Sequence, residues 1–179
     1  MKRLLFLALI ALLCLGVGLT LAYSSSASEA WKDPTSGLTW QVSPTGDLMK
    51  WQEARSHCQN LSLGGYSDWC LPTISELRSL IRGCPATQKG GICGVTDSCL
   101  SYKSCYNSSA CGGCSYKGGP GPGGAYWPPE LTGEVDWYWS SSAVADNDAN
   151  AWGVYFTLGN VNGSYTDYGH YDYARCVRP

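Results

Sequence analysis

Ten cysteines in a chain of 179 residues constrain the fold more than any other feature, because nine of them follow an export segment. Lys2 and Arg3 precede a nearly uninterrupted apolar run from Leu4 to Leu21, and small residues come next. This order predicts a secretory signal peptide over residues 1–27, or an N-terminal anchor if it is not cleaved. Cysteines that reach an oxidising compartment persist as disulfides. We therefore expect an extracytoplasmic chain (secreted, periplasmic or on the cell surface) that disulfides stabilise.

If Cys14 leaves with the signal peptide, nine cysteines remain, which is an odd number. One thiol is then free or bonded to another chain, so a homo-oligomer joined through it is one alternative. Cys111 and Cys114 have the C-x-x-C spacing of a redox pair or of half a zinc site. Export favours disulfides over zinc, and glycines follow where a redox motif needs a helix.

The composition indicates a folded, surface-exposed protein. Hydrophobic residues make up 44% and charged residues only 15% of the chain, which excludes a disordered protein. Eight Trp and 12 Tyr outnumber the 2 Phe. Such amphipathic rings suit half-wet surfaces and the faces of sugars. The net charge of −2 lacks the basic footprint of a nucleic-acid partner. Contact with a membrane is expected only through an uncleaved N-terminal segment.

Hydrophobic periodicity predicts one domain over residues 37–179, preceded by a linker over residues 28–36. Gly37–Val42 alternates as a strand does. Met49–Leu61 has the spacing of an amphipathic helix. Thr73 and Glu76 form a capping box, which predicts the start of a second helix that ends near Gly83. Further strands are expected over Trp137–Ser142, Trp152–Phe156 and Tyr171–Arg178.

Residues 84–124 differ from the rest of the chain. They contain six cysteines and the run Gly118–Gly124, rich in glycine and proline, and almost no apolar periodicity. Such a segment buries too little apolar surface to order itself, so we expect disulfides to stabilise it. We interpret it as an insertion on the domain and not as a separate core.

Five stretches in this order resemble the Lcl C-terminal domain family, also called DUF1566. They are Trp51–Cys58, Gly64–Leu77, Tyr138–Ser142, Ala151–Phe156 and Arg175–Arg178. The resemblance implies an α+β, C-type-lectin-like fold in which two helices flank small, mostly antiparallel sheets and the chain ends lie close together. It also implies an extracytoplasmic location in bacteria. In the best-known relative this domain is part of an adhesin and binds sulfated glycosaminoglycans.

The resemblance further implies a disulfide between Cys58 and Cys176, because the lectin-like plan places the first helix beside the last strand. The sequence departs from the family at Cys70, where an arginine is usual. We infer that Cys70 pairs into the Cys-rich insertion. The pairing within that network stays open among Cys70, Cys84, Cys93, Cys99, Cys105, Cys111 and Cys114. The acidic-proline-asparagine sugar motif of calcium-dependent lectins is missing.

Two groups of residues are candidates for ligand contacts. Side chains alternate between the faces of a strand, so we expect Trp139 and Trp152 in the core and Tyr138 and Tyr155 exposed. Between these strands, a polar loop offers oxygen atoms from Asp146, Asn147, Asp148 and Asn150. Asp146 and Asp148 are the candidate Ca²⁺ ligands, but we favour a hydrated surface loop. We expect no resident metal or cofactor.

No catalytic motif is present. We therefore expect a non-enzymatic domain for ligand binding or adhesion, whose partner is a glycan or a cell-surface polymer. The net acidity disfavours sulfated polymers for this member, since like charges repel. One alternative is a structural cell-surface protein linked by disulfides. Another is an enzyme like the formylglycine-generating oxidase, with Cys70 or Cys176 reactive, but no cation beside Cys70 is evident to lower its pKa.

Overall fold

The computed structural model describes residues 28–167 and 169–179. The expected signal peptide over residues 1–27 lies outside the described residues. The fold is α+β, with two three-stranded antiparallel sheets and a few short helices. Within the described ranges, no helix has the length and apolar character that a membrane span requires.

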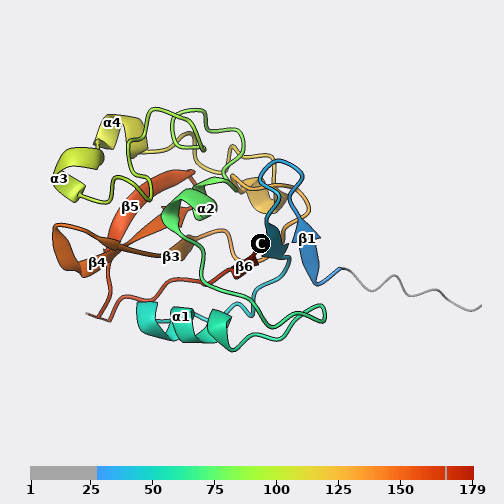
Figure 1. Cartoon of the computed structure of the whole chain (residues 1–179). Helices are drawn as coiled ribbons and strands as arrows, with labels where there is room; N and C mark the ends of the chain where they lie inside the picture. Colours follow the sequence, from blue (N-terminus) through green and yellow to red (C-terminus); the bar gives the residue numbers. More distant parts are fainter. Residues whose placement is uncertain (1–27, 168) are drawn as a thin grey trace, which may run out of the picture.

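The first sheet joins the two ends of the described chain. Its strand order is β1-β2-β6, so the first and last strands both pair with the central strand (Figure 1). The strands are β1 (Ala30–Lys32), β2 (Thr39–Gln41) and β6 (Val177–Arg178). The interpretation of residues 28–36 as a linker was wrong, because Trp31 pairs with Trp40 in a hairpin. A strand of three residues is too short for alternation to reveal it.

The second sheet has the order β3-β4-β5 and lies between two layers. Figure 1 shows helix α1 on one side of this sheet and the insertion, with helices α3 and α4, on the other. Trp139 and Ala151 pack with α1, whereas Trp152 and Val154 pack with buried cysteines of the insertion. The sheet therefore separates two hydrophobic cores. Its strands are β3 (Trp137–Val144), β4 (Asn147–Tyr155) and β5 (Asn160–Tyr165).

The helices are short, and each has a local cause. Helix α1 (Trp51–Gln59) buries Trp51, Ala54 and Cys58 on one face, as the spacing predicted. Helix α2 (Ile74–Arg78) begins with the expected capping box at Thr73 but ends earlier than predicted. The remaining helices are α3 (Tyr102–Cys105), α4 (Ser108–Cys111) and the 3-10 helix η1 (Pro122–Gly124), all within the insertion.

Four disulfides crosslink the part of the chain that the structure describes. Cys58 on α1 is bonded to Cys176, with an S–S distance of 2.04 Å, which is the pair that the resemblance implied. The six cysteines of the insertion pair among themselves in a nested order. The pairs are Cys84–Cys114, Cys93–Cys111 and Cys99–Cys105.

Cys70 is a free, exposed thiol, so the inference that it pairs into the insertion was wrong. The insertion leaves no cysteine for it, because its six thiols are already paired. The backbone of Cys70 instead bridges Val177, and its N–H donates to the Val177 carbonyl over 2.9 Å. Cys70 therefore lies at the edge of the first sheet, next to β6.

The buried Arg78 side chain holds an irregular segment by donating hydrogen bonds to its backbone carbonyl groups. The Arg78 guanidinium donates to the Thr87 carbonyl over 2.8 Å, to that of Gln88 over 3.2 Å, and to that of Val95. All three acceptors belong to the insertion. Buried carbonyls need such partners, so Arg78 orders a part of the insertion that has no regular structure.

We expect the Cys58→Ser/Cys176→Ser double variant to lose roughly 3–5 kcal/mol of the free energy of unfolding. A crosslink that closes so long a loop restricts the unfolded chain strongly. Chemical denaturation monitored by Trp fluorescence measures the loss. The matched control is Cys70→Ser, which removes an exposed, unpaired thiol and should change stability by less than about 0.5 kcal/mol. Equal effects of the two changes would contradict the assignment.

Candidate functional site

Tyr138 was predicted to be exposed, and this prediction was wrong. The side chain is fully buried, with its ring edge-on to Trp127 at 5.7 Å. Its hydroxyl donates to the Glu134 carbonyl over 2.8 Å, and burial raises the pKa of this phenol to about 12. The expectation failed because both faces of β3 are covered. Trp139 and Trp152 are fully buried, as expected.

Tyr155 is half-buried and stacks on Trp137, with ring centroids 5.2 Å apart and planes 17° apart. It stands at the far end of β4 from Asn147. A strand of nine residues puts roughly 26 Å between its ends at about 3.3 Å per residue. Tyr155 and the polar residues near Asn147 therefore do not form one site.

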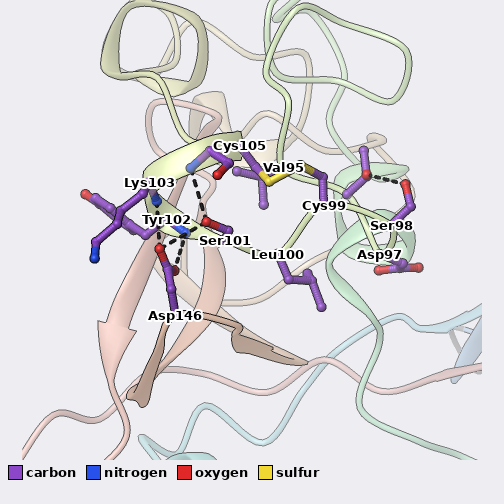
Figure 2. Close-up of a disulfide and its surroundings, with 12 residues drawn as sticks. Val95, Asp97, Ser98, Cys99, Leu100, Ser101, Tyr102, Lys103, Cys105 and Asp146 are labelled. Atoms are coloured by element: carbon purple, nitrogen blue, oxygen red, sulfur yellow. Dashed lines mark hydrogen bonds between the residues drawn. A yellow bond between two sulfur atoms is a disulfide. The ribbon is translucent and has the colours of Figure 1, made fainter.

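The polar segment after β3 is not the loop that we expected, because β4 already begins at Asn147. The Asp146 carboxylate accepts hydrogen bonds from the Tyr102 N–H over 2.5 Å, the Lys103 N–H over 3.0 Å and the Ser101 hydroxyl over 3.0 Å (Figure 2). The backbone bonds from Lys103 and Tyr102 are the main reason that the pKa of Asp146 is lowered. The Asp146 carboxylate, which we considered for Ca²⁺, thus fixes the start of α3 beside the Cys99–Cys105 disulfide.

The other members of that set do not converge with Asp146. Asn147 and Asp148 are exposed, and Asn150 is half-buried on β4. In the part of the chain that the structure describes, no three His, Cys, Asp or Glu side chains form a group suited to a metal ion.

Cys70 opens into a cleft of about 300 Å³ that Arg55 and Glu76 also line. Partial burial of the thiol, followed by the negative charges of Glu76 and Asp68, raises its pKa. A raised pKa lowers the fraction of reactive thiolate. Cys176 is already bonded to Cys58. The reactive pair that an oxidase needs is therefore not assembled from Cys70 and Cys176.

Sequence reasoning missed one groove. It lies between the β1–β2 hairpin, the residues after α2, and three prolines, of which Pro120 belongs to the insertion and Pro128 and Pro129 follow it. Two clefts of about 290 Å³ and 230 Å³ share Thr35 and Arg82. We call them together the hairpin groove. One cleft is also lined by Trp31, Asp33, Pro34, Pro120, Pro128, Pro129 and Glu130, and the other by Ser36, Ser79, Ile81, Gln88 and Lys89.

Asp33 organises the hairpin groove. Its buried carboxylate accepts hydrogen bonds from the Thr35 N–H over 3.0 Å, the Ser36 hydroxyl over 2.8 Å and the Arg82 guanidinium over 3.0 Å. Burial acts to raise the pKa of Asp33, but these bonds and the Arg82 charge outweigh it and lower the pKa. Asp33 is therefore ionised at neutral pH. The sequence signal was the turn-forming run Asp33–Gly37, two residues after Trp31.

The groove offers both an apolar surface and polar groups. The Trp31 ring is partly buried against the core and lies beside Pro128 and Pro129 on the groove wall. The Arg82 side chain, 28% exposed, lies at the middle of the groove and is fixed by Asp33. An aromatic face next to fixed hydrogen-bonding groups can hold a ring that is apolar on its face and polar at its edges.

A larger cleft of about 560 Å³ lies beside β1 and is lined by Ser28, Tyr66 and Arg178. The Tyr66 and Arg178 side chains that line this cleft already contact other residues of the protein. The Arg178 guanidinium forms two hydrogen bonds to Asp68, of 2.6 and 2.9 Å, and covers the Tyr66 ring at 3.8 Å. We therefore favour the hairpin groove as the candidate site.

These features define a disulfide-bonded α+β domain of the type that folds outside the cytoplasm. The chain belongs to the Lcl C-terminal domain family, whose family model matches residues 29–178. The match begins before β1, so it includes the hairpin that we had placed outside the domain. No curated protein matches the chain with significant similarity.

A buried acid lies where the segment before β6 meets α1. The Asp172 backbone bridges Met49, and its carboxylate lies 3.1 Å from His170 Nε2. Burial raises the pKa of Asp172 to about 6, although the charge of His170 acts against this, and Asp136 raises it further. The ordinary pKa in an unfolded chain is near 3.8.

We expect the contribution of Asp172 to the free energy of unfolding to fall as the pH rises from about 4 to about 7. In this window the folded state binds the Asp172 proton more tightly than the unfolded state, so this contribution is greatest below pH 3.8 and is lost through about pH 6. The loss is on the order of 3 kcal/mol, measured by chemical denaturation at several pH values. The Asp172→Asn variant should have a flatter profile; an unchanged slope would exclude Asp172 as its source.

Proposed function

We propose that this domain binds carbohydrate outside the cytoplasm, as a non-enzymatic adhesion or ligand-binding domain for a glycan or a cell-surface polymer. One observation carries the proposal: the hairpin groove combines the partly exposed Trp31 ring with the fixed pair of Asp33 and Arg82. Sugar rings bind through this combination of stacking and directed hydrogen bonds. The family membership supports an extracytoplasmic domain.

The polar groups of the groove are suited to holding a ligand, not to transferring protons. The Asp33 carboxylate already accepts three hydrogen bonds, and the Arg82 guanidinium also donates to the carbonyl groups of Ser79 and Ile81. A general acid or base needs a free group near the reacting atom. We accordingly assign no reaction and no cofactor to this site.

We also propose a C-type-lectin-like arrangement for the fold. Three observations support it. The chain starts and ends in one sheet, because β1 and β6 both pair with β2. The Cys58–Cys176 disulfide ties α1 to the segment before β6. Helix α1 covers one face of the second sheet.

The Trp31→Ala variant should lose binding to the glycans that the wild-type domain recognises. A glycan array identifies those ligands, and titration calorimetry then measures the affinity. Removing the aromatic contact should weaken binding by roughly tenfold or more. The matched control is Tyr116→Ala, since Tyr116 is 68% exposed and does not line the groove. If the wild type binds no glycan or polymer, the proposed function fails.

A second candidate function is that of a structural surface protein whose copies are joined by a disulfide. Cys70 favours it, because this residue is the one unpaired cysteine in residues 28–167 and 169–179 and its side chain is exposed. An exposed thiol in an oxidising compartment can bond to a second chain.

If copies are joined in this way, the exported protein should run as a dimer under non-reducing conditions and as a monomer after reduction. The Cys70→Ser variant should be monomeric in both. Non-reducing mass spectrometry of the protein from its producing cell measures this directly. A wild-type monomer with a free thiol at Cys70 would rule out the structural role.

A further inference from the structure

We infer that the hairpin groove binds an internal stretch of an uncharged polysaccharide, which lies across Arg82 and occupies both clefts. This inference rests on the proposed function and specifies its ligand. It is carried by four features of the groove: the way its two halves join, the balance of its charges, its uncharged hydrogen-bonding groups, and the rigidity of its walls.

The two halves form one site for an extended ligand. The clefts measure about 290 Å³ and 230 Å³. Each is smaller than the roughly 300–1,000 Å³ of a typical ligand pocket, whereas the two together fall in that range. Because Thr35 and Arg82 line both, a ligand can continue from one to the other. Lys89 lines one cleft and Glu130 the other, and both residues are exposed, so each cleft reaches the solvent.

The charges of the groove favour a neutral ligand. Two cations, Arg82 and Lys89, and two anions, Asp33 and Glu130, line the clefts. The strongest pair is internal, because the Arg82 guanidinium lies 3.0 Å from Asp33. A sulfate or carboxylate on the ligand would lose water without gaining a free cation at the centre, which is unfavourable.

Uncharged polar groups remain available for hydroxyl groups. Ser36 and Ser79 donate their own protons, to Asp33 and to the Glu76 carbonyl. The Ser36 oxygen already accepts a hydrogen bond from the Leu38 N–H over 3.4 Å, but a hydroxyl oxygen has two acceptor positions, so both serine oxygens can still accept one from a ligand. Gln88 adds a side-chain amide, whose two ends can donate and accept. These three residues lie in the cleft opposite Trp31, so one end of the groove stacks a ring and the other hydrogen-bonds.

The walls are fixed before the ligand arrives. Pro120, Pro128 and Pro129 form one wall, and their rings lock the backbone. Arg82 is held at the middle by the carbonyl groups of Ser79 and Ile81 and by Asp33. A preformed site loses little conformational entropy on binding, which suits a weak, repetitive ligand such as a polysaccharide.

Titration calorimetry of the full chain tests this inference with a ladder of neutral β-linked glucose and N-acetylglucosamine oligosaccharides, and with sulfated and carboxylated oligosaccharides of matched length. We expect the affinity for neutral oligosaccharides to rise with length until both clefts are filled, and then to stay level. A tag on the reducing end of a long oligosaccharide and added salt should each change the affinity by less than about twofold, because neither an end nor a charge is recognised.

Two variants separate the halves of the groove. Trp31→Ala should weaken binding of short and long neutral oligosaccharides alike. Gln88→Ala should weaken only the long ones, by roughly three- to tenfold. Lys103→Gln is the charge control, because Lys103 is exposed and lines neither cleft, and it should change neither affinity by more than about twofold. Thermal unfolding of each variant confirms that the domain is folded.

The outcomes separate the inference from the function on which it rests. A preference for sulfated or carboxylated oligosaccharides with steep salt dependence would overturn the inference and leave the carbohydrate function standing. Tight binding of the shortest oligosaccharide that a reducing-end tag abolishes would show end recognition, and would overturn it as well. If no oligosaccharide of any class binds, the proposed function itself fails.

Discussion

One short segment near the end of the domain, Arg175 to Val177, holds the two cores in place. The buried Arg175 guanidinium lies against Trp127 and Tyr138 and donates to the carbonyl groups of Gln41, Val42 and Thr132. Cys176 points to the other core and bonds to Cys58. Val177 completes the first sheet and bridges Cys70. A cation, a disulfide and a strand pair on three successive residues thus connect elements that the chain separates widely.

The insertion is also held to distant parts of the chain, but by other interactions. Its cysteines Cys84, Cys93 and Cys111 are buried in one cluster with Trp152, so it extends the main core and forms none of its own. Arg78 satisfies its carbonyl groups, and Asp146 fixes the start of its helix α3. The ring of Tyr102 stacks on Trp152 at 5.7 Å. A loop without periodicity becomes ordered because disulfides restrict it and charged side chains satisfy its buried backbone.

The sequence predicted what depends on local pattern and missed what depends on contacts between distant segments. Helix α1 and the buried Trp139 and Trp152 follow from periodicity, and the Cys58–Cys176 pair followed from the resemblance. Tyr138 was misplaced, because alternation implies one wet face and β3 has none. The hairpin groove combines Trp31, Arg82 and prolines from three separate segments. No spacing rule brings such residues together, and the turn-forming run after Trp31 was the only local signal of that site.

The Cys58–Cys176 disulfide, which closes most of the domain, has a mechanical consequence. When a surface domain is pulled by its two ends, the load enters at β1 and leaves at β6. The bond between Cys58 and Cys176 carries that load directly, so the 118-residue separation that it spans cannot be stretched. The residues between Cys58 and Cys176 are therefore protected from extension. They include the insertion, the strands of the second sheet and Arg82. Trp31 lies before Cys58, on the part of the chain that tension would extend first. Strong shear would therefore remove Trp31 from the wall of the groove while the rest of the domain stayed folded.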